Sequence, residues 1–511
     1  MRNVCFAFVD FSKAFDYLNH DILWKKLVDA GFSGRIYNMV RAMYANNKSC
    51  VKCNGAISEF FQCNIGVRQG ECISPVLFNL YINDIEQYFR DRGHEGMDFE
   101  IFRQSLLLYA DDTIIMAKSP ERLQLALDIL HDYCNKMKLT VNTEKTKVMK
   151  IVRYRRNTEP PLICKYNDIE LEEVRVFKYL GLNMANNGST IVTLNSLVNQ
   201  GLRALHSMKY YLLNARFLSP KTKLSIFDTL VKSVLLYSSP VWGFINTKKI
   251  EQIHLKFCKE ILQLRISTPD VMVYGELGRF PLDIDVKLSI LKFWLKILKS
   301  PNWSLLKMSY CLLLGDLQTN PQTINWASKT RDLLNNLGFG HIWISQNTPN
   351  EPQFIRAVER RLKDQFIQNW LGTLENSPKC RYYKLFKTTF AYEQYLDMPD
   401  KRIVNIISKY RCSNHNLQIE TGRWTRPLTP RENRICELCN SQVEDEYHFT
   451  LICDCFQVAR RNMLRPYYWE RPSIEKFTDL FNTTAKSLGE IKRLGKFLLH
   501  LTKLRKELLA A

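Results

Sequence analysis

The stretch SLLLYADDTIIMA, residues 105–117, places two adjacent aspartates inside an apolar run. Removing one charged carboxylate from water is costly, and removing two neighbouring ones without a cation costs more. The apolar flanks predict two strands that meet at Asp111 and Asp112. Either these side chains hold a positive ion, or the pair lies exposed at an ordinary hairpin turn.

A third carboxylate, Asp10, ends the predicted buried strand VCFAFVD. Three acids at strand ends within one domain suit a site for two Mg²⁺ ions, because Mg²⁺ binds carboxylates together with substrate phosphates. Two such ions help to form the nucleophile and stabilise the leaving oxygen in phosphoryl transfer. The aspartates alone do not exclude the exposed turn. The choice between a metal site and an exposed turn therefore rests on the neighbouring segments.

The chain is expected to form several domains, because 511 residues are too many for one core. Strand and helix patterns alternate over residues 1–187, which predicts an α+β domain. The remaining expected parts are a helical region at 188–310, a connecting segment at 311–429, a small Cys/His element at 430–460 and a basic helical tail at 461–511.

Short local signals predict individual elements. The pair Asn54-Gly55 predicts a tight hairpin turn. Ser74-Pro75 predicts a helix over residues 74–91 with Ser74 as its N-cap, and Ser119-Pro120 predicts a second helix in the same way.

The chain carries 72 Lys and Arg against 51 Asp and Glu, a net charge of +21. A globular protein this basic typically binds a polyanion, with nucleic acid as the first candidate, although a solvated basic surface is the alternative. No stretch approaches the roughly 20 apolar residues of a membrane span. The 15 scattered cysteines and the lack of a signal peptide predict a reducing compartment, nuclear or cytoplasmic, and no membrane partner.

Five segments in chain order carry a resemblance: FVDFSKAFD (8–16), GVRQGECISPVLFNLYIND (66–84), YADD (109–112), LTVNTEKTKVM (139–149) and FKYLGL (177–182). Together they resemble the palm of reverse transcriptases of LINE-type (non-LTR) retrotransposons, and the following helices are similar to the thumb. The resemblance implies a right-hand polymerase palm, an antiparallel sheet with helices, followed by a helical thumb. The resemblance implies an RNA-directed DNA polymerase with two Mg²⁺ ions. Its partners would be an RNA template, a DNA primer or target, and dNTPs.

The same resemblance assigns the catalytic roles. Asp10 and Asp111 match the metal-binding aspartates, and Asp112 matches the third acid. The backbone carbonyl of Phe11 matches a further Mg²⁺ ligand. Lys145 matches a lysine that protonates the leaving pyrophosphate, or is a solvated strand lysine.

Substrate and primer contacts follow from the matching blocks. Phe15 would lie below the sugar and exclude a 2′-OH, or is a core residue; Gln69 and Gly70 would lie beside template and nucleotide, where Gly70 permits close backbone approach. Arg68 would pair a phosphate, or is a surface charge. The residues expected to support the primer end, or to be ordinary sheet residues, are Phe177, Tyr179, Leu180 and Gly181.

A Cys/His element lies in CELCNSQVEDEYHFTLIC, with the spacing C-x2-C-x8-H-x4-C. Its candidate ligands are Cys436, Cys439, His448 and Cys453, and three thiolates with one imidazole suit tetrahedral Zn²⁺. Cys455 is the alternative to Cys453, and cysteines packed in a core are the alternative to a metal site. LINE-type proteins have a similar CCHC element after the thumb.

Two departures from the family divide the functional hypotheses. We expect the fingers that precede Asp10 in the family, and any endonuclease, to be missing from this chain. It would then be either a working reverse transcriptase or a truncated, catalytically inactive nucleic-acid-binding remnant. Group II intron and telomerase polymerases share the palm blocks, but the Cys/His element argues against them. The basic tail either contacts phosphates or docks its leucines on the body.

Overall fold

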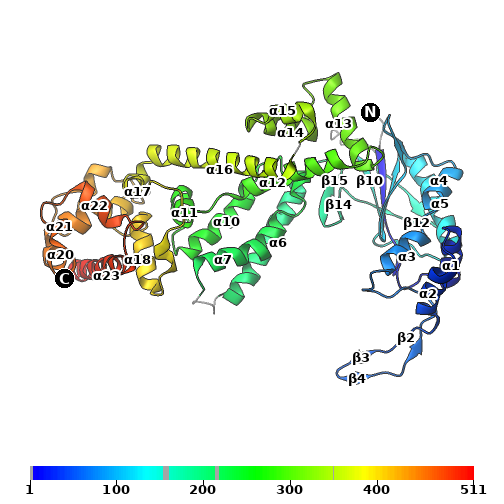
Figure 1. The fold of residues 1–511 in the computed structure, drawn as a ribbon, viewed down its shortest axis with the longest axis horizontal. Helices are drawn as coiled ribbons and strands as arrows, with labels where there is room; N and C mark the ends of the chain where they lie inside the picture. The colour runs from blue at the N-terminus through cyan, green and yellow to red at the C-terminus, as the bar shows by residue number, and fades with distance from the viewer. Residues whose placement is uncertain (1–3, 153–159, 213–217, 349, 511) are drawn as a thin grey trace. The chain divides into compact units, whose positions relative to one another are not determined.

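The computed structural model describes residues 4–152, 160–212, 218–348 and 350–510, and it divides into two compact units. The first unit comprises Met1–Thr193 with Asn302–Thr319, and the second comprises Leu194–Pro301 with Asn320–Ala511. The fold is mixed α+β: the sheet lies in the first unit, and the described part of the second unit is helical (Figure 1).

The first unit is built on a five-stranded sheet. Its strands, in spatial order, are β13 (Glu172–Glu173), β10 (Lys147–Ile151), β1 (Val4–Asp10), β9 (Asp112–Ala117) and β8 (Leu106–Tyr109). Four of them pair antiparallel as expected. The edge strand β13 pairs parallel with β10, so the sheet is mixed rather than antiparallel as the resemblance implied. The chain returns between the two through the hairpin of β11 (Lys165–Tyr166) and β12 (Ile169–Glu170).

Four more two-stranded hairpins lie in this unit: β2 (Lys48–Ser49) with β5 (Phe61–Gln62), β3 (Lys52–Cys53) with β4 (Ala56–Ile57), β6 (Met97–Asp98) with β7 (Arg103–Gln104), and β14 (Val176–Tyr179) with β15 (Leu182–Ala185). The turn between β3 and β4 is the predicted one, with Asn54 at φ 49° and Gly55 at φ 86°. In Figure 1 this hairpin extends away from the helices of the unit.

The helices of the first unit are α1 (His20–Asp29), α2 (Gly34–Ala45), α3 (Ser74–Tyr81), α4 (Ile85–Asp91), α5 (Pro120–Met137) and α13 (Leu305–Thr319). Ser119 caps α5 as expected, accepting from the Arg122 backbone N–H. The helix predicted over residues 74–91 divides instead into α3 and α4. Ser74 is not its N-cap: Ile73 holds that position, and the Ser74 hydroxyl donates to the Arg68 carbonyl at 2.6 Å.

The two faces of the sheet are covered differently because strand side chains alternate. On one face, Ala7 and Ile115 belong to a core shared with Leu127 of α5. On the other face, Phe8 packs with Ile114, Met116 and Met149. The β14–β15 hairpin covers this second face through Phe177, which lies in the same cluster. Asp10 follows Phe8 by two residues, so it shares the face that the hairpin covers.

The second unit contains, from Leu194 on, α6 (Ile191–Leu212), together with α7 (Pro220–Phe227), α8 (Ser233–Leu235), α9 (Ser239–Trp242), α10 (Lys248–Ile261), α11 (Asp270–Leu277), α12 (Leu282–Lys299), α14 (Trp326–Asn336), α15 (Gly340–Ser345), α16 (Glu351–Asn376), α17 (Tyr383–Phe386), α18 (Lys401–Arg411), α19 (Gln418–Thr421), α20 (Gln457–Met463), α21 (Pro466–Trp469), α22 (Ile474–Phe481) and α23 (Leu488–Ala510). Short π or 3₁₀ turns are η1 (Asp228–Lys232), η2 (Pro378–Cys380), η3 (Gln394–Asp397), η4 (Arg431–Asn433), η5 (His448–Ile452) and η6 (Asp454–Phe456).

A buried ion network lies in the core of the second unit. Arg411, at the end of α18, is fully buried with Glu276 of α11, and the two side chains pair at 2.9 Å. Glu393 pairs with Arg411 at 3.1 Å and with Lys387 at 2.5 Å. Because each of these charges has an oppositely charged neighbour, the network can be buried without leaving an isolated ion.

The basic tail docks on the body. Ile491, Leu494, Phe497, Leu498 and Leu501 of α23 are buried in the core that also contains α18. This is one of the two expectations for the tail, and it leaves Lys492, Lys496 and Lys503 exposed. None of the helices in the described ranges combines the length and apolarity that a membrane crossing requires.

Candidate active site and metal centre

The three aspartates meet at one end of the sheet. Asp10, the last residue of β1, is the direct register partner of Asp112, the first residue of β9. Side chains on directly opposed residues of an antiparallel pair have Cβ atoms roughly 5 Å apart. Register alone therefore brings two carboxylates, which are 102 positions apart in the chain, onto the same face.

Asp111 lies in the two-residue turn between β8 and β9, since Tyr109 pairs with Asp112. The first turn residue, Ala110, has φ 53°, in the left-handed region that costs a residue with a Cβ about 1 kcal/mol or more. Asp111 is half-buried and beside Asp112, so the sequence expectation of an acidic pair at a strand junction is confirmed. Its role in binding a cation stays a prediction.

The electrostatics of this corner are unfavourable for negative charge. Burial raises the pKa of the Asp112 carboxyl, and the charges of Asp111 and Asp10 raise it further. A divalent cation would relieve this repulsion. The ammonium of Lys145 already lies 3.7 Å from a carboxylate oxygen of Asp10.

The loop that carries Lys145 is fixed to the end of β1. The Asp10 carbonyl accepts from the Asn142 backbone N–H at 2.8 Å, and the Asp10 N–H donates to the Thr146 hydroxyl at 3.2 Å. Thr146 is fully buried, and Phe11 bridges to Val141. The sequence patterns did not identify Asn142 or Thr146 as site residues. The one feature that could have indicated them is that both lie in the same segment as Lys145.

Phe15 and Gln69 lie on segments near Asp16. The half-buried ring of Phe15 stacks on Phe78 of α3 with centroids 5.1 Å apart. The Gln69 side-chain amide donates to Asp16 at 2.9 Å. Phe15 is therefore held rigidly, which is compatible with both a core role and a role against the sugar.

The loop at Arg68 is held by internal contacts. The Arg68 guanidinium donates to Asn47, to the Met43 carbonyl and to Glu71, with which it pairs at 2.8 Å. A phosphate would have to compete with these partners. Gly70 has φ +92°, and a Cβ at this position would meet no atom within 4 Å. The backbone conformation of Gly70, rather than a close approach within the chain, therefore favours glycine.

The tight position in this loop is Gly66, which the sequence patterns did not single out. It has φ +82°, and a Cβ there would lie 2.5 Å from the carbonyl oxygen of Asp16. The Gly66 carbonyl also lies 2.8 Å from the His20 ring nitrogen. Any side chain at Gly66 would push the Gln69 loop away from the segment that carries Phe15.

The β14–β15 hairpin lies beside the aspartates. Phe177 stacks on Phe8 with centroids 4.1 Å apart and planes 16° apart. Leu180 (φ 45°) and Gly181 (φ 83°) form its two-residue turn. Burial raises the pKa of Tyr179, and the charge of Asp112 contributes, which places this phenol close to the acidic corner.

The four predicted zinc ligands come together in the second unit. One ligand atom each from Cys436, Cys439, His448 and Cys453 lies within 4.8 Å of the other three. Ligands of a tetrahedral Zn²⁺ at 2.0–2.3 Å lie roughly 3.3–3.8 Å from one another. The Cys439 Sγ and His448 Nε2 atoms, 3.3 Å apart, have this spacing, and three thiols with one imidazole are a donor set that suits the ion. Cys455 lies outside this group and is exposed.

Local hydrogen bonds shape this element. The Cys436 N–H donates to the Gln442 carbonyl at 2.8 Å, and the Asn440 N–H donates back to the Cys436 carbonyl at 2.9 Å. Asn440, at φ 52°, turns the chain between them. Hydrogen bonds from Cys453 and His448 lower the pKa of the Cys436 thiol, against the effect of burial. The cluster therefore favours a thiolate, the form that binds metal.

The element is part of the helical core. Cys436 and Cys453 belong to the same apolar cluster as Phe449 and Leu498. Arg505 of α23 pairs with Glu444 at 2.6 Å, inside the Cys/His loop. Arg505, one of the basic residues of the tail, therefore makes an internal contact. Among the described residues, the Cys/His cluster is the one set of three or more potential ligands gathered in this way; the three aspartates are less tightly grouped.

Comparisons with known proteins match the first 184 residues to a family and a larger share of the chain to individual proteins. Residues 1–184 match the family described as "Reverse transcriptase (RNA-dependent DNA polymerase)". The chain is 24% identical over 265 residues to the probable RNA-directed DNA polymerase from transposon X-element of Drosophila melanogaster, covering 50% of this chain and 28% of that protein. It is 22% identical over 299 residues to the Pol polyprotein of retrotransposable element R2 of Popillia japonica, covering 56% and 48%.

The chain thus spans less than a third of the X-element polymerase and about half of the R2 polyprotein. Among solved structures, apo telomerase from Candida tropicalis is similar over 37% of this chain and 35% of that chain, with 16% identity. The TM-score of this similarity is 0.27.

Proposed function

We propose that this chain is an RNA-directed DNA polymerase of a non-LTR retrotransposon that adds dNTPs to a primer 3′-OH along an RNA template. The match of residues 1–184 to the reverse transcriptase family and the similarity to polymerases of mobile elements support this proposal. The observation that carries the proposal is the register of β1 and β9, which opposes Asp10 to Asp112 with Asp111 in the adjoining turn. The sheet would then be the palm, and the helices after residue 187 would form the thumb.

Asp10, Asp111, Asp112 and the Phe11 carbonyl would hold two Mg²⁺ ions. Bound there, the ions would lower the cost of forming the 3′-alkoxide and of charge on the leaving oxygen. The raised pKa of Asp112 supports this assignment, because a carboxylate crowded by two others is stabilised by a cation.

Lys145 would donate a proton to the leaving pyrophosphate. Its side chain is 69% exposed, and its ammonium lies only 3.7 Å from Asp10, so it reaches the corner without being buried in it. The Asn142 and Thr146 contacts hold its loop against β1 and so position it.

The neighbouring residues would position the substrates. Phe15, braced by Phe78, would exclude a 2′-OH, and Gln69 with Gly70 would lie beside template and nucleotide. Phe177, stacked on Phe8, would support the primer end together with Tyr179 and the turn.

The Cys/His cluster would hold one structural Zn²⁺. Its four donors fit a closed tetrahedral site with no position left for a substrate. All 15 cysteines are free, which is compatible with the reducing nuclear or cytoplasmic setting that the proposal requires.

Primer extension on an RNA template, with an Asp111→Ala variant beside the natural chain, tests the polymerase. The second candidate function is nucleic-acid binding without extension, which the net charge of +21 also supports. Salt-sensitive RNA binding in the absence of any extension would favour that candidate.

A further inference from the structure

A second feature outside the aspartate corner suits a nucleic-acid strand. It is a pocket of about 410 Å³ in the second unit, between the residues that follow α10, the end of α18, the loop at 414–417 and α23. Its lining residues are Gln263, Leu264, Arg265, Ile406, Lys409, Tyr410, Asn414, His415, Asn416, Leu417, Thr502, Arg505 and Lys506.

The charge of the pocket is one-sided. Arg265, Lys409, Arg505 and Lys506 line it, and no carboxylate does. Arg505 is paired with the buried Glu444 at 2.6 Å and with the half-exposed Glu437 at 3.3 Å. In the described ranges, no ion pair is formed by Arg265, Lys409 or Lys506, so these three cations have no carboxylate in direct contact. A site with this field attracts a polyanion.

The polar lining suits a base as well as a phosphate. Asn414, Asn416 and Gln263 contribute side-chain amides, which hydrogen-bond to base edges. The Arg265 guanidinium donates to the Asn416 side chain and lies 4.6 Å from the ring centroid of Trp424, a residue 51% exposed. Aromatic rings and guanidinium planes stack on unpaired bases, which a duplex does not offer.

The inner wall of the pocket is rigid. His415 is buried and lies 2.9 Å from Glu446, and its other ring nitrogen accepts from the Leu417 N–H at 3.4 Å. Tyr410 stacks on His415 and on Phe449. The Asn414 N–H donates to the Lys409 carbonyl at 2.7 Å. The pocket is therefore formed before any ligand binds, which lowers the entropic cost of binding.

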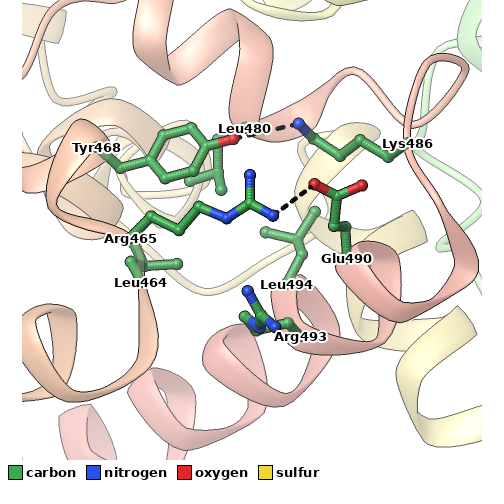
Figure 2. Close-up of a pocket in the computed structure, with 8 residues that line it drawn as sticks. All are labelled: Leu464, Arg465, Tyr468, Leu480, Lys486, Glu490, Arg493 and Leu494. Atoms are coloured by element: carbon green, nitrogen blue, oxygen red, sulfur yellow. Dashed lines mark hydrogen bonds and ion pairs between the residues drawn. The ribbon is translucent and has the colours of Figure 1, made fainter.

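Two other hollows of the second unit lack these properties. One, of about 440 Å³ beside η2, is lined by six basic residues, but also by Glu375, Glu420, Asp445 and Glu446. The other, of about 30 Å³, holds little more than a water molecule. In Figure 2, Arg465 is paired with Glu490, at 3.1 Å, and Lys486 donates to the Tyr468 hydroxyl, at 3.2 Å.

We propose that the pocket around Arg265, Lys409 and Lys506 binds single-stranded RNA, with phosphates on the cations and a base against the amides. It would be a contact for RNA separate from the aspartate corner. Single-stranded RNA, rather than duplex DNA, is favoured because the amides and the exposed Trp424 need unstacked bases. The choice of RNA rests on the proposed function, whereas the presence of a strand-binding pocket does not.

The test measures RNA binding by the full chain carrying Asp111→Ala, so that DNA synthesis cannot contribute. The probe is a fluorescent single-stranded RNA of about 12 nucleotides, within the usual length of single-strand sites. The pocket variant is Lys409→Gln with Lys506→Gln. The matched control is Arg356→Gln with Arg361→Gln, which removes the same charge from the exposed face of α16.

Two lost phosphate contacts should lower the slope of log affinity against log salt by about 1.4, and should weaken binding roughly tenfold at moderate salt. The control should leave the slope unchanged. Asn416→Ala should weaken binding several-fold without altering the slope, because it removes a neutral contact. RNA carrying 4-thiouridine should cross-link within residues 409–424.

An equal loss of RNA affinity in the pocket variant and in the control variant would overturn the proposal, since the change in net charge alone would explain it. So would a pocket variant that loses affinity for duplex DNA but not for single-stranded RNA. Primer extension by the chain with its natural Asp111 reports the polymerase separately. Intact primer extension without an effect of the pocket variant on RNA binding would contradict the pocket proposal alone. A specific effect of the pocket variant on RNA binding without primer extension would contradict the polymerase proposal alone.

Discussion

Asp10 and Asp112 are direct register partners at the ends of β1 and β9. The apolar alternation behind them fixes this relationship, because a one-residue slip of either strand would turn its buried side chains to the other face. Phe8 and Ile114, two positions inside the strands, form the next pair on that face. The core beneath the acidic corner thus holds the aspartates in place. The repulsion between their carboxylates lowers the stability of the folded state.

Asp112→Asn should stabilise the protein while abolishing synthesis. The pKa of Asp112 is raised above its usual 3.8, so the folded state binds this proton more tightly than the unfolded state. Ionisation therefore costs stability as pH rises through and beyond that value. We expect a higher melting temperature for the variant at pH 7, and a difference that disappears as the pH falls below 3.8. A lower melting temperature at pH 7 would contradict this account.

Cys436→Ser should remove bound zinc. The chain is expected to carry about one equivalent by elemental analysis, as one Cys₃His site requires. Because Cys436 is buried in the core with Phe449, loss of the metal should also lower the melting temperature. Cys455→Ser is the control and should retain the ion, since Cys455 is exposed and outside the cluster. Metal-free natural protein would refute the site.

Arg411→Met should destabilise the second unit strongly. The substitution keeps much of the side-chain volume but leaves the buried Glu276 and Glu393 without their shared partner. Breaking a buried pair in this way typically costs about 3–5 kcal/mol, which should appear in denaturant unfolding as about that loss. Arg402→Met, in the same helix but with a side chain 83% exposed, should change stability by less than about 1 kcal/mol. Similar losses in both variants would argue against the network.

Lys145→Gln should slow the chemical step. Loss of a general acid commonly lowers the rate by about 10²-fold or more. Single-turnover extension should show this loss, and the affinity for primer and template should stay close to that of the natural chain. Lys147→Gln is the control, because Lys147 pairs with Glu172 on the neighbouring strand. An unaltered rate in Lys145→Gln would make Lys145 a surface lysine.

Local sequence signals predicted the elements whose causes are local. The Asn54-Gly55 turn requires two residues that tolerate positive φ, and the structure has both there. The junction at Asp111 and Asp112 follows from apolar runs on either side. The four Cys and His residues are spaced so that one short hairpin and one helical turn bring them together.

Other features depend on pairings that no local signal carries. Arg411 pairs with Glu276, which lies 135 positions away in the sequence. The residues flanking each of them give no indication that the charge is buried. The helix α13 belongs to the first unit although 108 residues of the second unit precede it, and it runs across the boundary expected at residue 310. The parallel pairing of β13 depends on the path of the chain through the β11–β12 hairpin.

Primer extension tests the central claim most directly. The purified chain would receive an RNA template, an annealed DNA primer, dNTPs and Mg²⁺, in parallel with Asp111→Ala. We expect extension by the natural chain and a loss of about a thousandfold or more in the variant, because the metal site supplies several kcal/mol. Circular dichroism should show both proteins folded, since Asp111 lies in a turn. Equal extension by the two proteins would contradict the assignment of the aspartate corner as the catalytic site.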